Sequence, residues 1–110
     1  MDNLNQSDIL ASLADTLERL IASRVGVVEA AQQVSSVRHR LRQDNNPLFL
    51  SFLAIDSETD RFPVGPAREH WAPDALLRYD QEREVVEQRL KPFALQSAVE
   101  LLAWVRENAL

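Results

Sequence analysis

The sequence predicts an all-α fold, a compact bundle of four to five helices with one long crossover loop that contains proline and glycine. Apolar residues recur at three- and four-residue spacing over most of the chain, which is the period of amphipathic helices. Signals for helix starts precede these stretches, and the two glycines, Gly26 and Gly65, fall between them. The chain has 110 residues, 45% hydrophobic and 26% charged, so we expect one helical domain over residues 1–110.

The first half of the chain predicts two antiparallel helices separated by a tight turn. Ser7 is the predicted N-cap of a helix over about residues 8–23. Gly26 marks the turn, and basic residues end the second helix, because the helix dipole favours cations there. The first apolar stripe comprises Ile9, Leu10, Leu13, Leu17, Leu20 and Ile21, and the second comprises Val27, Ala31, Val34, Val37 or Arg38, and Leu41.

A third helix is predicted to begin at Pro47. Asn46 is a suitable N-cap, and proline suits the first helical position because no N–H is needed there. The apolar residues that follow would also suit a buried strand, but the cap and the lack of β-branched residues before Ile55 favour a helix. Asp56 is expected to end this helix.

Residues 56–72 are predicted to form the long crossover loop, because two prolines and a glycine interrupt regular structure there. A fourth helix opens at Pro73, and its thin apolar stripe predicts the most exposed helix of the fold. Pro92 is expected to kink or end it before a final helix. The fourth stripe comprises Leu76, Leu77, Asp80, Arg83, Val86 or Glu87, and Leu90, and the last comprises Ala94, Ala98, Leu101 or Leu102, and Val105.

The net charge of −5 is concentrated in one part of the chain. Residues 56–87 contain nine acidic and four basic residues, a difference that equals the whole net charge. A surface of this sign repels nucleic-acid phosphates and attracts basic proteins, so we predict a basic protein partner and no nucleic-acid binding. The alternative is a solvated face that only aids solubility.

Several classes of chemistry lack their residues in this sequence. The absence of cysteine excludes disulfides and thiolate chemistry, and fits a cytoplasmic location. No apolar run is long enough to cross a bilayer, and the first residues do not resemble a signal peptide, so no membrane association is expected. Eleven of the twelve basic residues are arginine, which indicates a GC-rich, bacterial genome.

Metal and catalytic sites are also not expected. Asp56, Glu58 and Asp60 have the spacing that opens a calcium-binding loop. That loop also needs a glycine at its sixth position and a glutamate at its twelfth, where this chain has Arg61 and Ala67. The two histidines stand far apart, and there is no glycine-rich phosphate loop and no nucleophile elbow. We therefore expect no metal, no cofactor and no enzyme.

The long loop is the strongest candidate for a functional surface. Phe62 and Trp71 flank its rigid segment, and ordered loops of this length are often functional. These aromatic residues either anchor the crossover in the core or hold the loop so that its charged residues are displayed. The candidate partner-binding residues are Asp56, Glu58, Asp60, Arg61, Arg68, Glu69, His70 and Trp71.

The same region carries a resemblance to known sequences. The strings "FLSFLAIDSETDRFPVG" and "WAPDALLRYD", with "SRVGVVEAAQQV" before them, resemble a group of small uncharacterised bacterial proteins. Members of that group share an acidic "IDSETD" stretch, a following proline and glycine, and a tryptophan before a helix. The resemblance covers roughly residues 20 to 90 and implies a bacterial origin and a recurrent loop, but no activity.

Together these observations predict a non-catalytic protein-binding module. Its favoured form is an acidic immunity or antitoxin-like inhibitor that docks on a basic partner protein. One alternative is a structural homodimer that pairs through the exposed fourth helix. Another is a small enzyme or ligand binder that uses the loop acids together with His70.

Overall fold

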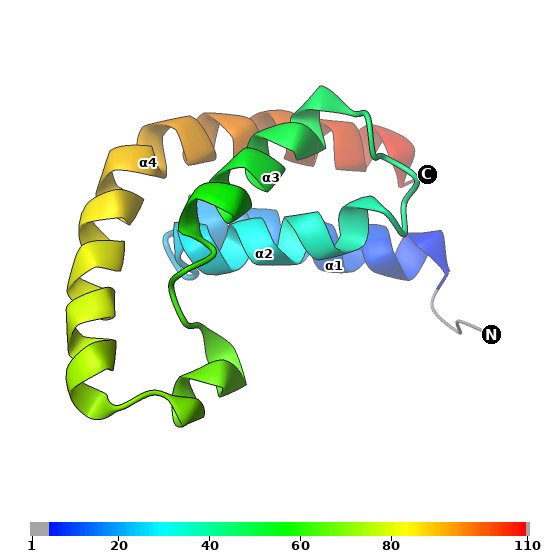
Figure 1. Cartoon of the computed structure of the whole chain (residues 1–110). Helices are drawn as coiled ribbons and strands as arrows, with labels where there is room; N and C mark the ends of the chain where they lie inside the picture. Colours follow the sequence, from blue (N-terminus) through cyan, green and yellow to red (C-terminus); the bar gives the residue numbers. More distant parts are fainter. Residues whose placement is uncertain (1–4, 110) are drawn as a thin grey trace.

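The computed structural model describes residues 5–109, and in that range it contains helices and no strands. The described residues form four α-helices and one short 3-10 helix, which confirms the predicted all-α fold of four to five helices (Figure 1). Residues 1–4 and 110, which the single-domain prediction included, lie outside the described residues. The elements are α1 (Gln6–Ile21), α2 (Val27–Arg38), α3 (Pro47–Thr59), η1 (Gly65–His70) and α4 (Pro73–Asn108).

The antiparallel pair formed by α1 and α2 is present, but its first cap differs from the prediction. Asn5, not Ser7, is the N-cap of α1: its Oδ1 accepts a hydrogen bond from the N–H of Asp8 at 2.9 Å. Ser7 therefore lies within the first turn, and the helix begins and ends two residues earlier than predicted. Helix α2 ends at Arg38, so the buried Leu41 reaches the core from the turn that follows.

Helix α3 begins as predicted and ends later than predicted. Asn46 caps it through a 3.0 Å hydrogen bond to the N–H of Leu48. The helix continues past Asp56 to Thr59, whose buried hydroxyl donates a 2.7 Å hydrogen bond to the carbonyl of Ile55. The prediction that Asp56 ends the helix was therefore wrong, and the irregular segment is shorter than residues 56–72 and contains η1.

Helix α4 replaces the two last helices that the sequence suggested. It runs for 36 residues through Pro92, and Figure 1 shows that it bends as it wraps around the other helices. A bend at this place is expected, because proline lacks the N–H of one backbone hydrogen bond and its ring crowds the preceding turn. Pro92 itself is exposed. The helix therefore continues through Pro92, and its bend agrees with the kink that this proline predicts.

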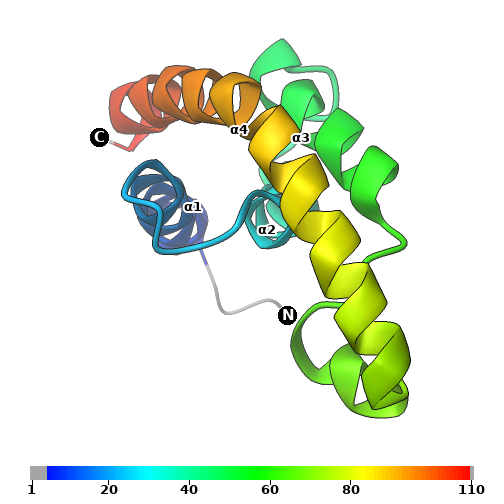
Figure 2. The ribbon, with the colours of Figure 1, turned by 90° about the vertical axis from the view of Figure 1, so that its left-hand side faces the viewer.

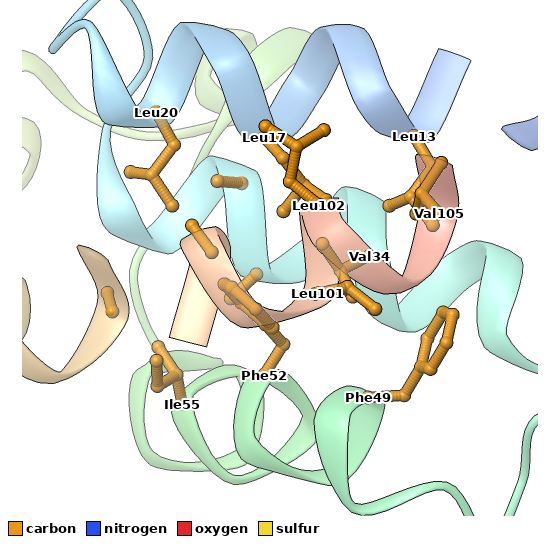
Figure 3. Close-up of a cluster of buried hydrophobic side chains, with 14 of the residues drawn as sticks. Leu13, Leu17, Leu20, Val34, Phe49, Phe52, Ile55, Leu101, Leu102 and Val105 are labelled. Atoms are coloured by element: carbon orange, nitrogen blue, oxygen red, sulfur yellow. The ribbon is translucent and has the colours of Figure 1, made fainter. Parts of the chain in front are cut away.

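The core lies between α1, α2, α3 and the second half of α4 (Figure 3). Phe49 packs edge-on against Trp104 with ring centroids 5.3 Å apart, so α3 and α4 share an aromatic contact. Burying large aliphatic and aromatic side chains stabilises a fold by about 1.5–3 kcal/mol each. The largest contributors are Leu17, Leu20, Val34, Phe49, Phe52, Ile55, Leu101 and Val105.

The chain between α3 and the bend of α4 lies outside this core. Residues 60–85, which we call the arm, comprise the connecting loop, η1 and the first half of α4. Figures 1 and 2 show from two directions that the arm extends away from the packed helices. Trp71 is 36% exposed, so it does not anchor the crossover in the core, and the first of the two expected roles is wrong for this residue. Phe62 is 2% exposed and thus buried, as that role requires, although it lies outside the main core cluster.

Candidate functional surface on the arm

The eight predicted partner-binding residues do not form one loop. Asp56 and Glu58 lie in the last turns of α3, and Asp60 follows as its C-cap. Arg61 begins the connecting segment, while Trp71 is the C-cap of η1. The other three predicted residues, Arg68, Glu69 and His70, belong to η1.

Glu58 is engaged within the chain. Its Oε1 accepts a hydrogen bond from Nη2 of Arg89 at 2.6 Å, and this ion pair joins the end of α3 to α4. Both side chains are largely exposed, so the pair contributes little to the free energy of unfolding. The ion pair matters for binding, because a partner would have to compete with Arg89 for the carboxylate of Glu58.

Arg68 is also engaged within the chain. Its guanidinium donates two hydrogen bonds to the carboxylate of Asp80, at 2.7 and 2.8 Å, and a third to the carbonyl of Pro63 at 3.3 Å. Such a bidentate pair fixes geometry as well as charge. The hydrogen bond from Arg68 is the main reason that the pKa of Asp80 is lowered, and the same bond raises the pKa of Arg68. Arg68 thus holds η1 against α4 and is not available to a partner.

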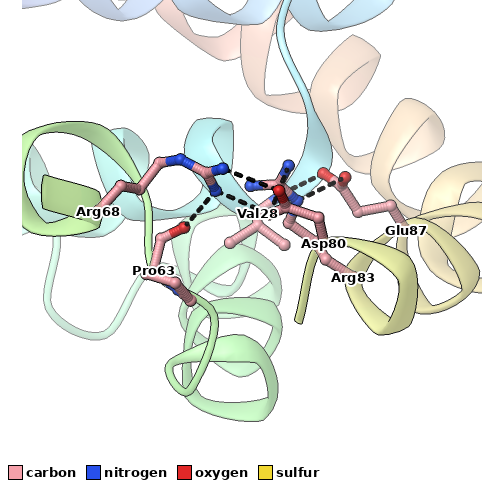
Figure 4. Close-up of polar contacts among 6 residues, drawn as sticks. All are labelled: Val28, Pro63, Arg68, Asp80, Arg83 and Glu87. Carbon is pink, nitrogen blue, oxygen red and sulfur yellow. Dashed lines mark hydrogen bonds and ion pairs between the residues drawn. The ribbon is translucent and has the colours of Figure 1, made fainter. Parts of the chain in front are cut away.

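Figure 4 shows how this pair continues into a charged chain along α4. Asp80 also contacts Arg83 at 3.4 Å, and Nε of Arg83 lies 3.7 Å from Oε1 of Glu87. The other oxygen of Glu87 accepts a 3.0 Å hydrogen bond from the N–H of Val28, so it caps the N-terminus of α2. The chain of contacts fastens the arm to the helical bundle.

Gly26 makes this cap possible. Gly26 is the N-cap of α2 but has no side chain that could accept a hydrogen bond from the helix. The carboxylate of Glu87 accepts that hydrogen bond in its place. A Cβ atom on residue 26 would lie 2.6 Å from Oε2 of Glu87, which is too close. Sequence reasoning assigned Gly26 only to a turn. The sequence did contain a sign of the contact with Glu87. Three charged residues interrupt the apolar stripe of the fourth helix: Asp80, Arg83 and Glu87.

Three aromatic rings form the centre of the arm. Trp71 packs edge-on against Tyr79 with ring centroids 5.1 Å apart, and Tyr79 packs edge-on against Phe62 at 6.4 Å. The guanidinium of Arg61 lies 4.3 Å from the centroid of the Phe62 ring. Each edge-on pair is worth about 0.5–1.5 kcal/mol beyond the area it buries. Tyr79, which sequence reasoning missed, therefore fixes the position of the exposed Trp71.

A cavity of about 300 Å³ opens beside these rings. Asp60, Arg61 and Trp71 line it, so the structure brings together three of the eight predicted residues. Glu69 and His70 are exposed on η1 and are not among its lining residues. The remaining lining residues are Gln32, Phe62, Pro63, Val64 and Ala67.

The electrostatics of this surface are set by unpaired acids. Burial raises the pKa of Asp56, the nearby charge of Asp60 raises it further, and Ser35 on α2 opposes the rise. Asp60 forms no ion pair with any described residue. Asp60 lines the cavity, and a cation placed beside it would also offset the repulsion between Asp60 and Asp56.

A larger cavity of about 340 Å³ lies between the α1–α2 turn and α4. Its lining mixes charges of both signs, including Arg24, Lys91 and Glu84, and Lys91 donates a 3.1 Å hydrogen bond to the hydroxyl of Ser23. None of the eight predicted residues lines it. We give more weight to the smaller cavity, because it combines an exposed aromatic ring with an unpaired charge.

The described residues also bear on metals and membranes. Nowhere between residues 5 and 109 do three histidine, aspartate or glutamate side chains come close enough together to hold a metal ion. In the same range, no helix has the length and apolar character needed to span a membrane.

Comparison with known proteins gave no match of any kind: no family model fits the chain, and neither a curated protein nor a solved structure is similar to it. The resemblance to small bacterial proteins therefore stays a prediction.

Proposed function

We propose that this protein is a non-catalytic binding module whose arm docks on a protein with a basic surface. The observation that carries the proposal is the position of Trp71, which is 36% exposed and packs in a T-shaped contact with Tyr79, with ring centroids 5.1 Å apart. Tryptophan, tyrosine and arginine are the residues that most often dominate binding energy at protein interfaces. A ring that is already fixed loses little conformational freedom when a partner covers it.

The charge of the arm supports a basic partner. Arg68 and Arg83 neutralise Asp80 and Glu87 within the chain, and the acids that remain in the arm outnumber its other two arginines, Arg61 and Arg78. Such a surface steers a basic protein toward the arm and raises the association rate, an effect that weakens as salt screens the charges. The acids within the arm that form no ion pair with a described residue are Asp60, Glu69, Asp74, Glu82 and Glu84.

An acidic immunity or antitoxin-like inhibitor is the specific form that we favour. In such a protein the acidic face covers a basic active site, so electrostatic complementarity sets both speed and specificity. The arm suits this role because it extends from the bundle and can enter a concave surface (Figure 2).

Affinity capture from the native cell tests the proposal. The tagged protein is used as bait at low and at high salt, beside the variants Trp71→Ala and Phe93→Ala. Phe93 is a matched control, because it is an aromatic residue, 50% exposed, on α4 outside the arm. We expect one basic protein that the wild type and Phe93→Ala retain at low salt, and that high salt or Trp71→Ala releases. Equal retention by both variants would contradict the role of the arm.

A homodimer is the second candidate, and exposed residues on α4 favour it. Val85 and Val99 are 68% and 57% exposed, and their spacing places them on one face of the helix with Pro92. The bend of α4 limits how much of this face a second copy can cover, since the helix curves around its own bundle (Figure 1). Sedimentation equilibrium separates the two candidates: the binding module predicts a monomer, and twice the monomer mass would favour the dimer.

A further inference from the structure

We infer that the cavity beside Trp71 receives an arginine side chain of the partner, with Asp60 as its counter-ion. This inference rests on the proposed function and specifies the chemistry that the arm recognises. The cavity of about 300 Å³ lies at the small end of the range for ligand sites, which suits one inserted side chain.

The aromatic wall of the cavity fits a cation. Trp71 lines the cavity, and its edge-on contact with Tyr79 fixes the ring. Cations bind over the faces of aromatic rings, and tryptophan is the best ring for this interaction. Phe62, Pro63 and Val64 complete an apolar wall that can cover the methylene groups of the inserted side chain.

Asp60 is the one acidic residue among the described residues that line the cavity. Its carboxylate has no ionic partner among the described residues, and it lies close enough to Asp56 for the two negative charges to repel each other. An inserted cation would relieve this repulsion and form charge-assisted hydrogen bonds with Asp60. The side chain of Gln32, which reaches the cavity from α2, offers a further polar contact.

Arg61 also lines the cavity, and its other contacts explain why it does not form an ion pair with Asp60. Its guanidinium lies on the Phe62 ring, and its Nη1 donates a 3.1 Å hydrogen bond to the carbonyl of Glu58. These contacts hold Arg61 at the rim without an ion pair to Asp60. Its charge repels the incoming cation, so replacing Arg61 by glutamine is expected to tighten binding.

Arginine fits this combination better than lysine does. A guanidinium is planar, stacks on aromatic rings and can offer two parallel hydrogen bonds to one carboxylate. A lysine ammonium is a compact and strongly hydrated charge that loses more on leaving water. A cavity that pairs Trp71 with Asp60 therefore selects the planar cation.

A titration followed by NMR tests this inference on the whole chain. The probe is N-acetyl-arginine amide, and the control probe is N-acetyl-citrulline amide, which has the same shape without the charge. The signals are the indole N–H of Trp71 and the backbone N–H of Asp60, and the indole of Trp104 in the core serves as the internal reference. We expect the first two to shift with arginine and to shift much less with citrulline, while Trp104 stays unchanged.

Variants make the test specific. Asp60→Asn should weaken arginine binding about tenfold, because it removes a charge-assisted contact. Glu107→Gln is the matched control, since Glu107 is an exposed acid near the end of α4 that lies outside the arm and does not line the cavity, and it should leave binding unchanged. Equal shifts with arginine and citrulline, or equal affinity in Asp60→Asn and wild type, would overturn the inference.

The outcome also separates this inference from the proposed function. If Trp71→Ala releases the captured partner but Asp60→Asn does not, the arm is the interface and the arginine site is wrong. If arginine binds beside Trp71 as described but no basic protein is captured, the arginine site stands and the proposed protein-binding function is wrong.

Discussion

The carboxylate of Glu87 accepts a hydrogen bond from the backbone N–H of Val28 at 3.0 Å, although 59 positions separate the two residues. Helix α2 has no capping side chain of its own, so one of its free N–H groups is satisfied from another helix. The same carboxylate ends the charged chain that begins at Arg68 in η1. One residue therefore links the start of α2 to the arm.

Removing the Glu87 carboxylate is expected to destabilise the fold. Glu87→Ala takes away the cap of α2 and should lower the free energy of unfolding by about 1–2 kcal/mol, the usual range for a lost N-cap. Urea unfolding measures this change. Glu84→Ala is the control, because Glu84 is an exposed acid on the same helix with no ion pair to a described residue. If the two variants unfolded at the same urea concentration, the cap would have no role in stability.

Gly26 and Glu87 are expected to be energetically coupled. In the wild type, Gly26→Ala should destabilise by about 1 kcal/mol, because the new Cβ displaces Glu87 and breaks its hydrogen bond. With Glu87→Ala already present, the same change should be neutral or stabilising, because the φ of −75° at residue 26 suits alanine. A double-mutant cycle in urea measures the coupling, and additive effects would refute it.

The Arg68–Asp80 pair predicts an acid-sensitive arm. Because the folded-state pKa of Asp80 is lowered, the pair stabilises the arm above the unfolded pKa of about 3.9, and this contribution is lost as pH falls through the folded pKa. The N–H of Trp71, which donates to the carbonyl of Arg68 at 3.1 Å, is a direct probe. Its protection against hydrogen exchange should fall below about pH 4, ahead of the core amides.

Asp80→Asn should produce the same loosening at neutral pH. The amide keeps the size of the side chain but loses the charge that Arg68 binds. Asp74→Asn, an exposed acid at the start of α4, is the control and should leave the exchange of Trp71 unchanged. Unchanged protection of Trp71 in Asp80→Asn would mean that the ion pair does not hold η1.

Asp56 predicts the opposite dependence on pH. Burial, with a further contribution from the charge of Asp60, raises its folded-state pKa, so the charged form costs stability above that pKa. Asp56→Asn should therefore raise the melting temperature at pH 7, and this gain should shrink as pH falls toward 4, where the wild-type carboxyl binds a proton. Thermal unfolding at both pH values measures the difference. A loss of stability at pH 7 would contradict the expected cost of the charge.

The helices could be predicted from the sequence because their signals are local. The apolar period placed α1, α2 and α3, and Asn46 with Pro47 marked the start of α3. The predicted helix ends were wrong where two nearby residues could each cap the helix, or where a contact with a distant residue determines where the helix ends. Asn5 and Ser7 are equally good caps, so position alone could not choose between them.

The end of α3 shows how tertiary contacts override a local rule. Asp56 was expected to end this helix because two prolines and a glycine interrupt regular structure in the residues that follow. Burial of Thr59 and the pairing of Glu58 with Arg89 support the extra turn. Neither contact follows from the spacing of residues along the chain.

The candidate site was only partly predictable for the same reason. The acidic excess and the place of Trp71 beside the proline and glycine segment could be seen in the sequence, but its exposure could not. The internal pairing of Arg68 and the contact between Trp71 and Tyr79 depend on how η1 folds back on α4. The sequence therefore identified the charged residues of this region. It could not show which of them pair within the chain and which are exposed to a partner.

The most direct test of the arm as a binding surface is the affinity of the captured partner for two variants. Isothermal titration calorimetry should give a Kd about 30-fold weaker for Trp71→Ala, as for an interface hot spot, and within about twofold of wild type for Phe93→Ala. Circular dichroism of both variants confirms that each is folded. Equal affinity of Trp71→Ala and wild type would show that the partner does not bind through the arm.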